Sequence, residues 1–232
     1  MSMNKDCCNG ECPSLKTSWL SELDKNDRCM VMEYAVTVRL KKGQNVFEQG
    51  SNTQGFFCIR SGAVKLALNA GNGDSMTVDL YSDSGMLGHH CMVSPTNFYT
   101  ATCLTDAEVC FIPKSAVAKI KPPASLDSKI RNQIGGDYIR LNEIISSLRT
   151  KSTLQRTAEV LVRLQATFGS DNDGAVNLYV TKGELANIIG SSVESVFRTL
   201  GRLRQKKYIN FEKSKIWIKD ESKLRAIARL NS

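Results

Sequence analysis

The sequence predicts an α+β protein with an N-terminal β domain, one long helix and a helical C-terminal domain. Between residues 35 and 113, apolar residues recur with a period of two, as in β-strands. From 130 to 148 they follow a near-heptad spacing, and beyond 150 they return at helical intervals. A chain of 232 residues is long enough for two small domains.

The N-terminal part is expected to begin with a short helix and to continue as a β-sandwich or barrel. Over residues 14–33, Leu15, Trp19, Leu20 and Leu23 lie at helical spacing. The β region then runs to about Pro113. Glycines at 43, 50, 62, 73 and 85 separate its apolar runs at strand-plus-turn intervals.

A long helix is expected after Pro122-Pro123, which break the chain. Its apolar stripe consists of Ile130, Ile134, Tyr138, Leu141, Ile145 and Leu148. This stripe could pack on its own domain or against a second copy of the same helix. Asp137, Arg140 and Glu143 leave only a narrow apolar seam, which favours a helix paired with its copy in a homodimer.

Residues 181–204 have the pattern of two short helices joined by a tight turn. Thr181 and Glu184 match a capping box at the start of the first helix. Gly190 allows a turn in which a side chain would clash, and Ser191 or Ser192 caps the second helix. This is the helix-turn-helix arrangement. Alternating residues at 208–211 and 215–218 predict a small hairpin, or wing, after it.

The exposed face of the second helix predicts contact with duplex DNA. Arg198 can bond to guanine O6 and N7, and Glu194 can accept a bond from cytosine N4. Charge supports this interpretation, because residues 150–232 carry a net +7 and residues 1–149 a net +1. We therefore expect a sensor part at 1–121, a dimerisation helix at 122–149 and a DNA-binding domain at 150–232.

Eight cysteines are present, and three of them lie in KDCCNGECPS (5–14): Cys7, Cys8 and Cys12. The start of the chain has no apolar stretch like that of a secretory signal, and no apolar run approaches the ~18 residues that span a bilayer. We therefore expect a cytoplasmic protein without a membrane partner, in which a disulfide framework is disfavoured. Metal ligands, redox thiols and small core residues remain open, and Cys58 and Cys103 are expected in the core.

Over essentially its whole length the chain resembles the Crp/Fnr family of bacterial transcription regulators. The resemblance lies in GQNVFEQG (43–50), FFCIRSGAVKL (56–66), VCFIPKS (109–115) and ELANIIGSSVESVFR (184–198). It implies a cyclic-nucleotide-type β-roll (a jelly roll), a long dimerisation helix and a winged helix-turn-helix. It also implies a homodimer on an inverted-repeat DNA site, with RNA polymerase as a partner.

The family's DNA contacts carry over to matching positions. Expected base-reading residues are Val193, Glu194, Phe197 and Arg198. The resemblance implies phosphate contacts by Ser192 and Ser195. Further expected phosphate contacts are Thr181, Lys182, Arg202, Lys206 and Lys207. Val193 resembles the oxygen-responsive branch, whereas Phe197 departs from the small hydroxyl residue usual there.

The resemblance also bears on which effector molecule the N-terminal domain would sense. Cyclic-AMP binders of the family use a Gly-Glu pair and an arginine, but Met86 follows Gly85 here and Tyr99 stands near the arginine position. Without that cation a cyclic phosphate would bind poorly, so cyclic AMP is not expected.

Iron–sulfur regulators of the family hold a [4Fe–4S] cluster with three N-terminal cysteines and one distant cysteine, which is Cys110 here. Cys7 and Cys8 are adjacent, unlike the family spacing, so Cys29 is a candidate substitute ligand. Reactive thiols, a zinc site, a small-molecule effector or no bound effector are the alternatives. His89-His90, the only histidines, could ligate haem or belong to a loop. No enzyme constellation is found.

Overall fold

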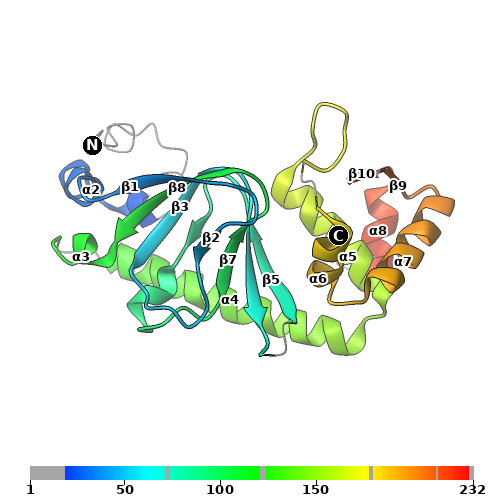
Figure 1. The fold of residues 1–232 in the computed structure, drawn as a ribbon, viewed down its shortest axis with the longest axis horizontal. Coiled ribbons are helices and arrows are strands. Elements are labelled where there is room, and N and C mark those ends of the chain that lie inside the picture. Colours follow the sequence, from blue (N-terminus) through cyan, green and yellow to red (C-terminus); the bar gives the residue numbers. More distant parts are fainter. Residues whose placement is uncertain (1–18, 72–73, 121–123, 178–179, 213, 230–232) are drawn as a thin grey trace. The chain divides into compact units, whose positions relative to one another are not determined.

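The structure, a computed structural model, describes residues 19–71, 74–120, 124–177, 180–212 and 214–229 (Figure 1). The chain divides into two compact units. One comprises residues 1–71 and 79–140, and the other comprises residues 72–78 and 141–232. None of the helices in these described ranges is both long and apolar enough to cross a membrane.

The prediction of a single helix over 14–33 is wrong for the described part of this range, which contains two separate helical elements. A 3-10 turn, η2 (Trp19–Glu22), precedes helix α2 (Lys25–Met32). The carboxylate of Asp24 accepts a hydrogen bond of 2.9 Å from the amide of Asp27 and thereby caps α2. An aspartate in this position starts a new helix rather than continuing the old one.

The expected β region is confirmed as a roll of two four-stranded sheets. Its strands are β1 (Val36–Leu40), β2 (Asn45–Phe47), β3 (Gly55–Ser61), β4 (Val64–Asn69), β5 (Ser75–Tyr81), β6 (Met86–Leu87), β7 (Thr100–Cys103) and β8 (Ala107–Pro113). One sheet has the order β1-β8-β3-β6, and the other has the order β2-β7-β4-β5. A 3-10 turn, η3 (His89–Met92), follows β6.

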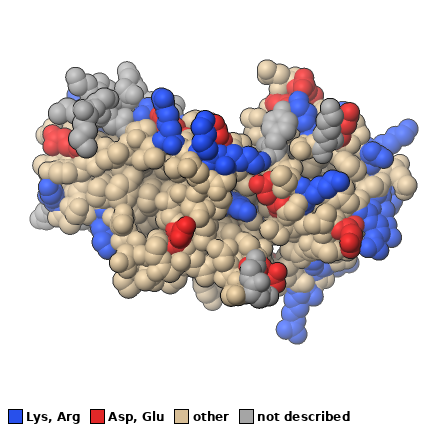
Figure 2. All heavy atoms as spheres, in the orientation of Figure 1, with Lys and Arg blue, Asp and Glu red and all other residues tan. Residues whose placement is uncertain are grey.

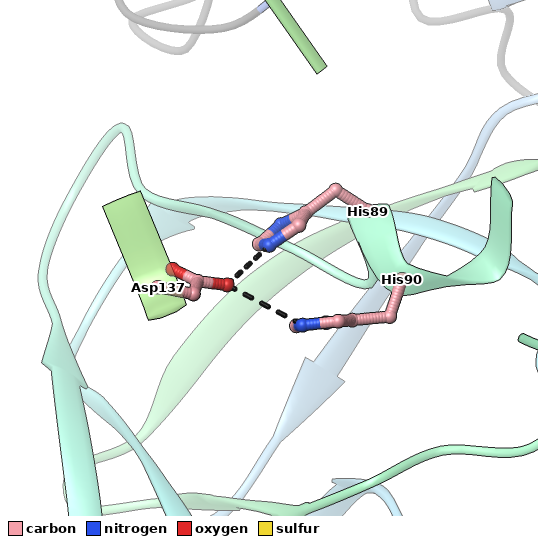
Figure 3. A group of neighbouring side chains, drawn as sticks. All are labelled: His89, His90 and Asp137. Carbon is pink, nitrogen blue, oxygen red and sulfur yellow. Dashed lines mark hydrogen bonds and ion pairs between the residues drawn. The ribbon is translucent and has the colours of Figure 1, made fainter. Parts of the chain in front are cut away.

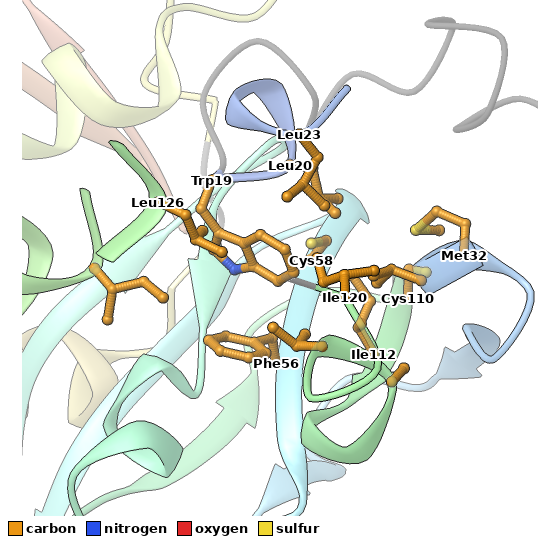
Figure 4. Packing of buried hydrophobic residues seen from close by; sticks show 14 of the residues in the cluster. Trp19, Leu20, Leu23, Met32, Phe56, Cys58, Cys110, Ile112, Ile120 and Leu126 are labelled. Carbon is orange, nitrogen blue, oxygen red and sulfur yellow. The ribbon is translucent and has the colours of Figure 1, made fainter. Parts of the chain in front are cut away.

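A hydrophobic cluster joins the N-terminal helices to the first sheet (Figure 4). Trp19 packs edge-on against Phe56, with ring centroids 4.9 Å apart. Three cysteines, Cys58, Cys91 and Cys110, belong to the same cluster. Cys58 and Cys103 are each 1% exposed, which confirms them as core residues.

Helix α3 (Lys114–Val117) is short, and α4 (Ala124–Thr150) is the expected long helix. The start of the predicted α4 stripe packs within its own unit, because Ile130 is buried in the hydrophobic cluster and Ile134 lies against it. Farther along, Tyr138, Ile139 and Ile145 are exposed. Gly135 and Gly136 are exposed mid-helix glycines, and a Cβ at either would have no neighbour within 4 Å.

The C-terminal unit contains five helical and strand elements expected from the sequence and one that was not. The expected elements are α5 (Thr153–Phe168), α6 (Lys182–Ile189), α7 (Val193–Gln205), β9 (Ile209–Glu212) and β10 (Lys215–Ile218). Strands β9 and β10 pair antiparallel, as predicted for the wing. Helix α8 (Glu221–Ala228) was missed; it packs against α5 and buries Leu224 and Ala228.

Candidate functional site

The local sequence around 181–195 sets the start and end of both helices of the helix-turn-helix. Thr181 Oγ1 accepts a 3.1 Å bond from the amide of Glu184, whose carboxylate accepts a 2.6 Å bond from the amide of Thr181. This is the predicted capping box. Ser192 caps α7 by accepting a bond from the amide of Ser195, so Ser192 and not Ser191 has this role.

Gly190 makes the turn between the helices for two reasons. Its φ of 67° lies in the left-handed region, which side chains other than glycine rarely adopt. A Cβ at this position would also lie 2.6 Å from Cδ2 of Leu148. Leu148, expected in the dimer seam, therefore packs in this structure against the turn of the DNA-binding motif.

The guanidinium of Arg156, which the sequence reasoning missed, ties together several backbone segments. It donates to the carbonyls of Ile189 (3.1 Å) and Gly190 (3.1 Å) at the end of α6. It also donates to the carbonyls of Lys151 (2.9 Å) and Leu148 (3.4 Å) at the end of α4. Carbonyl groups at helix ends lack intrahelical partners. The bonds from Arg156, a residue of α5, therefore hold the end of α6 in place against α5.

The exposed face of α7 carries the predicted DNA-reading groups. Val193, Glu194, Arg198 and Arg202 are exposed, as are Arg204, Lys206 and Lys207 beyond them. Figure 2 shows Lys and Arg atoms gathered over the part of the C-terminal unit where Figure 1 places α7. Thr181 and Lys182 are exposed, and Ser192 and Ser195 lie at the start of α7, where free amides favour phosphate.

Phe197 is placed differently from the other predicted base readers. It is half-buried, and its ring packs edge-on against Phe211 of the wing, with centroids 5.9 Å apart. The ammonium of Lys182 lies 4.8 Å from the Phe197 ring centroid. A groove of about 310 Å³ lies between these residues, Val180 and Ile216. Phe197 thus holds the wing beside α7, and its predicted role in reading bases stays untested.

The wing is anchored by the loop at 170–174. Lys215 forms ion pairs with Asp171 (3.0 Å) and with Asp173. The indole Nε1 of Trp217 donates a 3.1 Å bond to the carbonyl of Asp173. Strand β10 of the hairpin is therefore held close to this loop.

The predicted sulfur ligands are distributed between the described and the undescribed parts of the chain. Cys7, Cys8 and Cys12 lie outside the described residues. Cys29 is half-buried on α2. Cys110 is 1% exposed on β8, where it stands opposite Cys58 in the strand register.

His89 and His90 converge on Asp137 of α4 (Figure 3). Their Nε2 atoms lie 2.5 Å and 3.4 Å from the same oxygen, Oδ2 of Asp137. Burial and the neighbouring His89 lower the pKa of His90 to about 4, although Asp137 opposes this, so His90 is a neutral imidazole at pH 7. The sequence pointed to the two histidines but not to Asp137.

Of the positions compared above with cyclic-AMP binders, Tyr99 lies near this group. Met86 is in β6, and Tyr99 is buried with its ring 5.7 Å from that of His90. Burial, followed by the charges of Asp137 and Asp79, raises the pKa of the Tyr99 hydroxyl. The electrostatic potential around Tyr99 is therefore negative.

Comparison with known proteins agrees with both halves of the fold. Residues 37–121 match the cyclic nucleotide-binding domain model, and residues 155–227 match the Crp-like helix-turn-helix domain model. Electron transport regulator A of Shewanella oneidensis is 25% identical over 96% of this chain and 89% of its own. The fumarate and nitrate reduction regulatory protein of Vibrio cholerae is 26% identical over 90% and 83%.

Among solved structures, FixK2 from Bradyrhizobium japonicum superimposes with a TM-score of 0.74 at 16% identity, covering 83% of this chain and 96% of that one. This likeness supports the fold. The helix-turn-helix domain and the regulators named above identify a DNA-binding transcription regulator rather than an enzyme. The chain is a member of the Crp/Fnr family.

Proposed function

We propose that this regulator acts as a homodimer on an inverted-repeat DNA site and that oxygen, nitric oxide or oxidants tune its DNA binding through its cysteines. The observation that carries the DNA-reading part is the exposed face of α7, with Glu194 and Arg198 side by side near its capped N-terminus. A recognition helix in this form enters a major groove with its N-terminal residues at the base edges.

The dimer is supported by the apolar side chains that α4 leaves exposed. Tyr138 and Ile145 are 70% and 63% exposed, and Ile139 is 61% exposed. Three large apolar residues on one exposed helix are unusual unless another surface covers them. A second copy of α4 would do so and would place two recognition helices on one duplex.

Selection from random DNA tests this arrangement. We expect enrichment of inverted repeats whose half-sites are about one helical turn apart. Enrichment of single or asymmetric half-sites would contradict the symmetric dimer. RNA polymerase is the expected partner of the bound dimer, and a transcription assay on the selected site shows whether the bound protein activates or represses.

Redox control is supported by the position of Cys110. It lies in the same hydrophobic cluster as Trp19. Trp19 is the described residue that follows the N-terminal cysteines most closely in the sequence. Cys12 is seven residues before Trp19, a separation of at most about 25 Å for extended chain. Cys7, Cys8, Cys12 and Cys110 would hold a [4Fe–4S] cluster, with Cys29 as the substitute ligand. When bound, such a cluster supplies iron that reacts with oxygen and nitric oxide.

The test is anaerobic purification of the full chain, followed by iron and sulfide assay and visible absorbance. Cys110→Ala should abolish the chromophore and the air sensitivity of DNA binding together. Cys103→Ala is the matched control, because Cys103 is as buried as Cys110 but lies in the other sheet. A colourless anaerobic protein that binds DNA equally with and without air would end the redox proposal and leave the DNA-binding function intact.

A cyclic nucleotide is the second effector class that the fold suggests, and the residues disfavour it. The carboxylates of Asp79 and Asp137 lie in the part of the roll around Tyr99, and the cation nearest to Asp79, Arg140, is already paired with it. An anionic phosphate would meet net negative charge there. Haem ligated by His89 or His90 and a zinc–thiolate site at the tail remain alternatives for the signal.

A further inference from the structure

His89, His90 and Asp137 bring three metal-ligating side chains together in the β-roll. The two histidines are consecutive in η3, and Asp137 comes from α4, 48 residues later. One ligand atom from each residue lies within 4.8 Å of the other two. Figure 3 shows both imidazoles pointing at the same carboxylate oxygen of Asp137.

We propose that these three residues bind one divalent transition-metal ion, for which zinc and ferrous iron are the best matches. Neutral imidazole nitrogens and a carboxylate oxygen are ligands of both ions. Three protein ligands leave a further coordination position for water or a small molecule. Cys91 is not counted as a ligand, because it belongs to the hydrophobic cluster and its sulfur is not among the ligand atoms that converge here.

One separation between the ligand atoms already matches that of a metal site. Two ligands about 2.1 Å from a zinc ion lie roughly 3.4 Å apart at a tetrahedral angle. His90 Nε2 and Asp137 Oδ2 are already 3.4 Å apart. His89 Nε2 and Asp137 Oδ2, at 2.5 Å, form a hydrogen bond that an ion would replace after a movement of about 1 Å.

Charge also favours a cation at this position. Asp137 is only 15% exposed, and within the described residues the two histidines are the basic side chains that reach its carboxylate. The adjacent Asp79 is paired with Arg140. Burial and then Asp79 and Asp137 raise the pKa of the Tyr81 hydroxyl, which is a further sign of local negative potential. A divalent cation would neutralise a carboxylate that is costly to bury unpaired.

The backbone holds the histidines in place before any ion arrives. Gly88 has a φ of 83°, and a Cβ there would lie 2.5 Å from the carbonyl oxygen of Gly55. η3 can therefore approach β3 only with glycine at this point. The His89 and His90 rings lie 4.4 Å apart, and Phe98 and Tyr99 pack on His90. Ligands held by packing need little rearrangement to bind.

His89 is hard to explain as a packing residue. Its side chain is 2% exposed, and its Nδ1 atom is buried with no hydrogen-bond partner among the residues that the structure describes. Buried polar groups are nearly always hydrogen-bonded, so a buried imidazole with one unbonded nitrogen costs stability at this position. A core position of this kind would be filled better by an apolar side chain unless the imidazole has a ligand to bind.

The test uses the full chain with Cys7, Cys8 and Cys12 all changed to serine, so that tail thiols cannot bind the probe. After removal of metal with a chelator, Zn²⁺ is titrated, and Co²⁺ is used as a spectroscopic substitute. We expect one ion per chain, a rise in melting temperature on adding Zn²⁺, and cobalt bands without strong thiolate charge transfer. DNA binding is measured in a separate assay, so that a loss of DNA binding is not mistaken for a loss of metal binding.

Asp137→Asn and His90→Gln should each weaken Zn²⁺ binding by about 100-fold or more, since loss even of an outer-shell group costs 10–100-fold. Asp127→Asn is the matched control, because Asp127 is an exposed aspartate on the same helix. His90→Gln keeps the test decisive if Asp137→Asn does not fold. Unchanged Zn²⁺ affinity in both site variants, or no binding by the serine-substituted chain, would overturn the proposal.

Discussion

In the proposed DNA complex, Arg198 is the residue on which we expect sequence recognition to depend most directly. It is exposed on α7, one turn from the capped N-terminus, where a guanidinium can reach two acceptors of one guanine. Lys206 is also exposed but follows the helix, so we expect it to contact the phosphate backbone rather than base edges.

Arg198→Ala should therefore cost about 1–3 kcal/mol of specific binding and relax the preference at one G·C pair in each half-site. Lys206→Ala should weaken binding to all sequences alike. It should also reduce the slope of log affinity against log salt concentration by about one, the value for one lost phosphate contact. Competition binding with site variants at several salt concentrations separates the two effects. If base preference survives in Arg198→Ala, α7 does not read DNA in the proposed register.

At the scale of elements, Arg156 connects the ends of α4 and α6 through four backbone carbonyls. Replacing it with leucine would leave these acceptors without a charged donor. We expect Arg156→Leu to lower the free energy of unfolding by about 2–4 kcal/mol, with partial recovery in Arg156→Lys. Urea denaturation followed by circular dichroism measures this.

Arg225→Leu is a suitable control for that experiment. Arg225 pairs with Glu221 one turn away on α8, and its side chain is 41% exposed. Surface pairs of this kind contribute about 0.3–0.5 kcal/mol. Similar losses in the Arg156 and Arg225 variants would show that the carbonyl contacts do not stabilise the motif.

The sequence predicted the elements whose signals are local. The capping box at Thr181, the turn at Gly190 and the alternation of the wing each lie within a few residues, so spacing was enough to find them. Helix α8 was missed because it is short and depends on packing against α5, although Asp220 offered a capping signal. Without that packing, eight residues are too few for a stable helix.

The convergence on Asp137 could not be predicted for a different reason. Its partners are 47 and 48 residues away in the sequence, and only the tertiary fold brings η3 against α4. The same holds for Phe197, which was assigned to DNA because of its position on α7. Its contact with Phe211 depends on where the wing folds back.

At the scale of the whole molecule, the proposed dimer depends on the exposed apolar residues of α4. Ile145→Asp should shift the protein from dimer to monomer in analytical ultracentrifugation and weaken binding to a full inverted repeat, because a charge in an apolar seam is strongly disfavoured. Val93→Asp provides the comparison, since Val93 is similarly exposed at 65% but lies on the roll. Dissociation by both variants, or by neither, would argue against pairing through α4.

The adjacent glycines of α4 have a consequence for the rates at which the helix opens. Each lacks a side chain and costs the helix about 0.5–1 kcal/mol, and neither Gly135 nor Gly136 has a neighbour that requires the small residue. Amide protons around this pair should exchange with deuterium faster than those near either end of α4, so the helix would fluctuate as two stiff segments joined by a short softer one. Gly135→Ala with Gly136→Ala should slow that exchange, and uniform protection along α4 of the unmodified chain would contradict it.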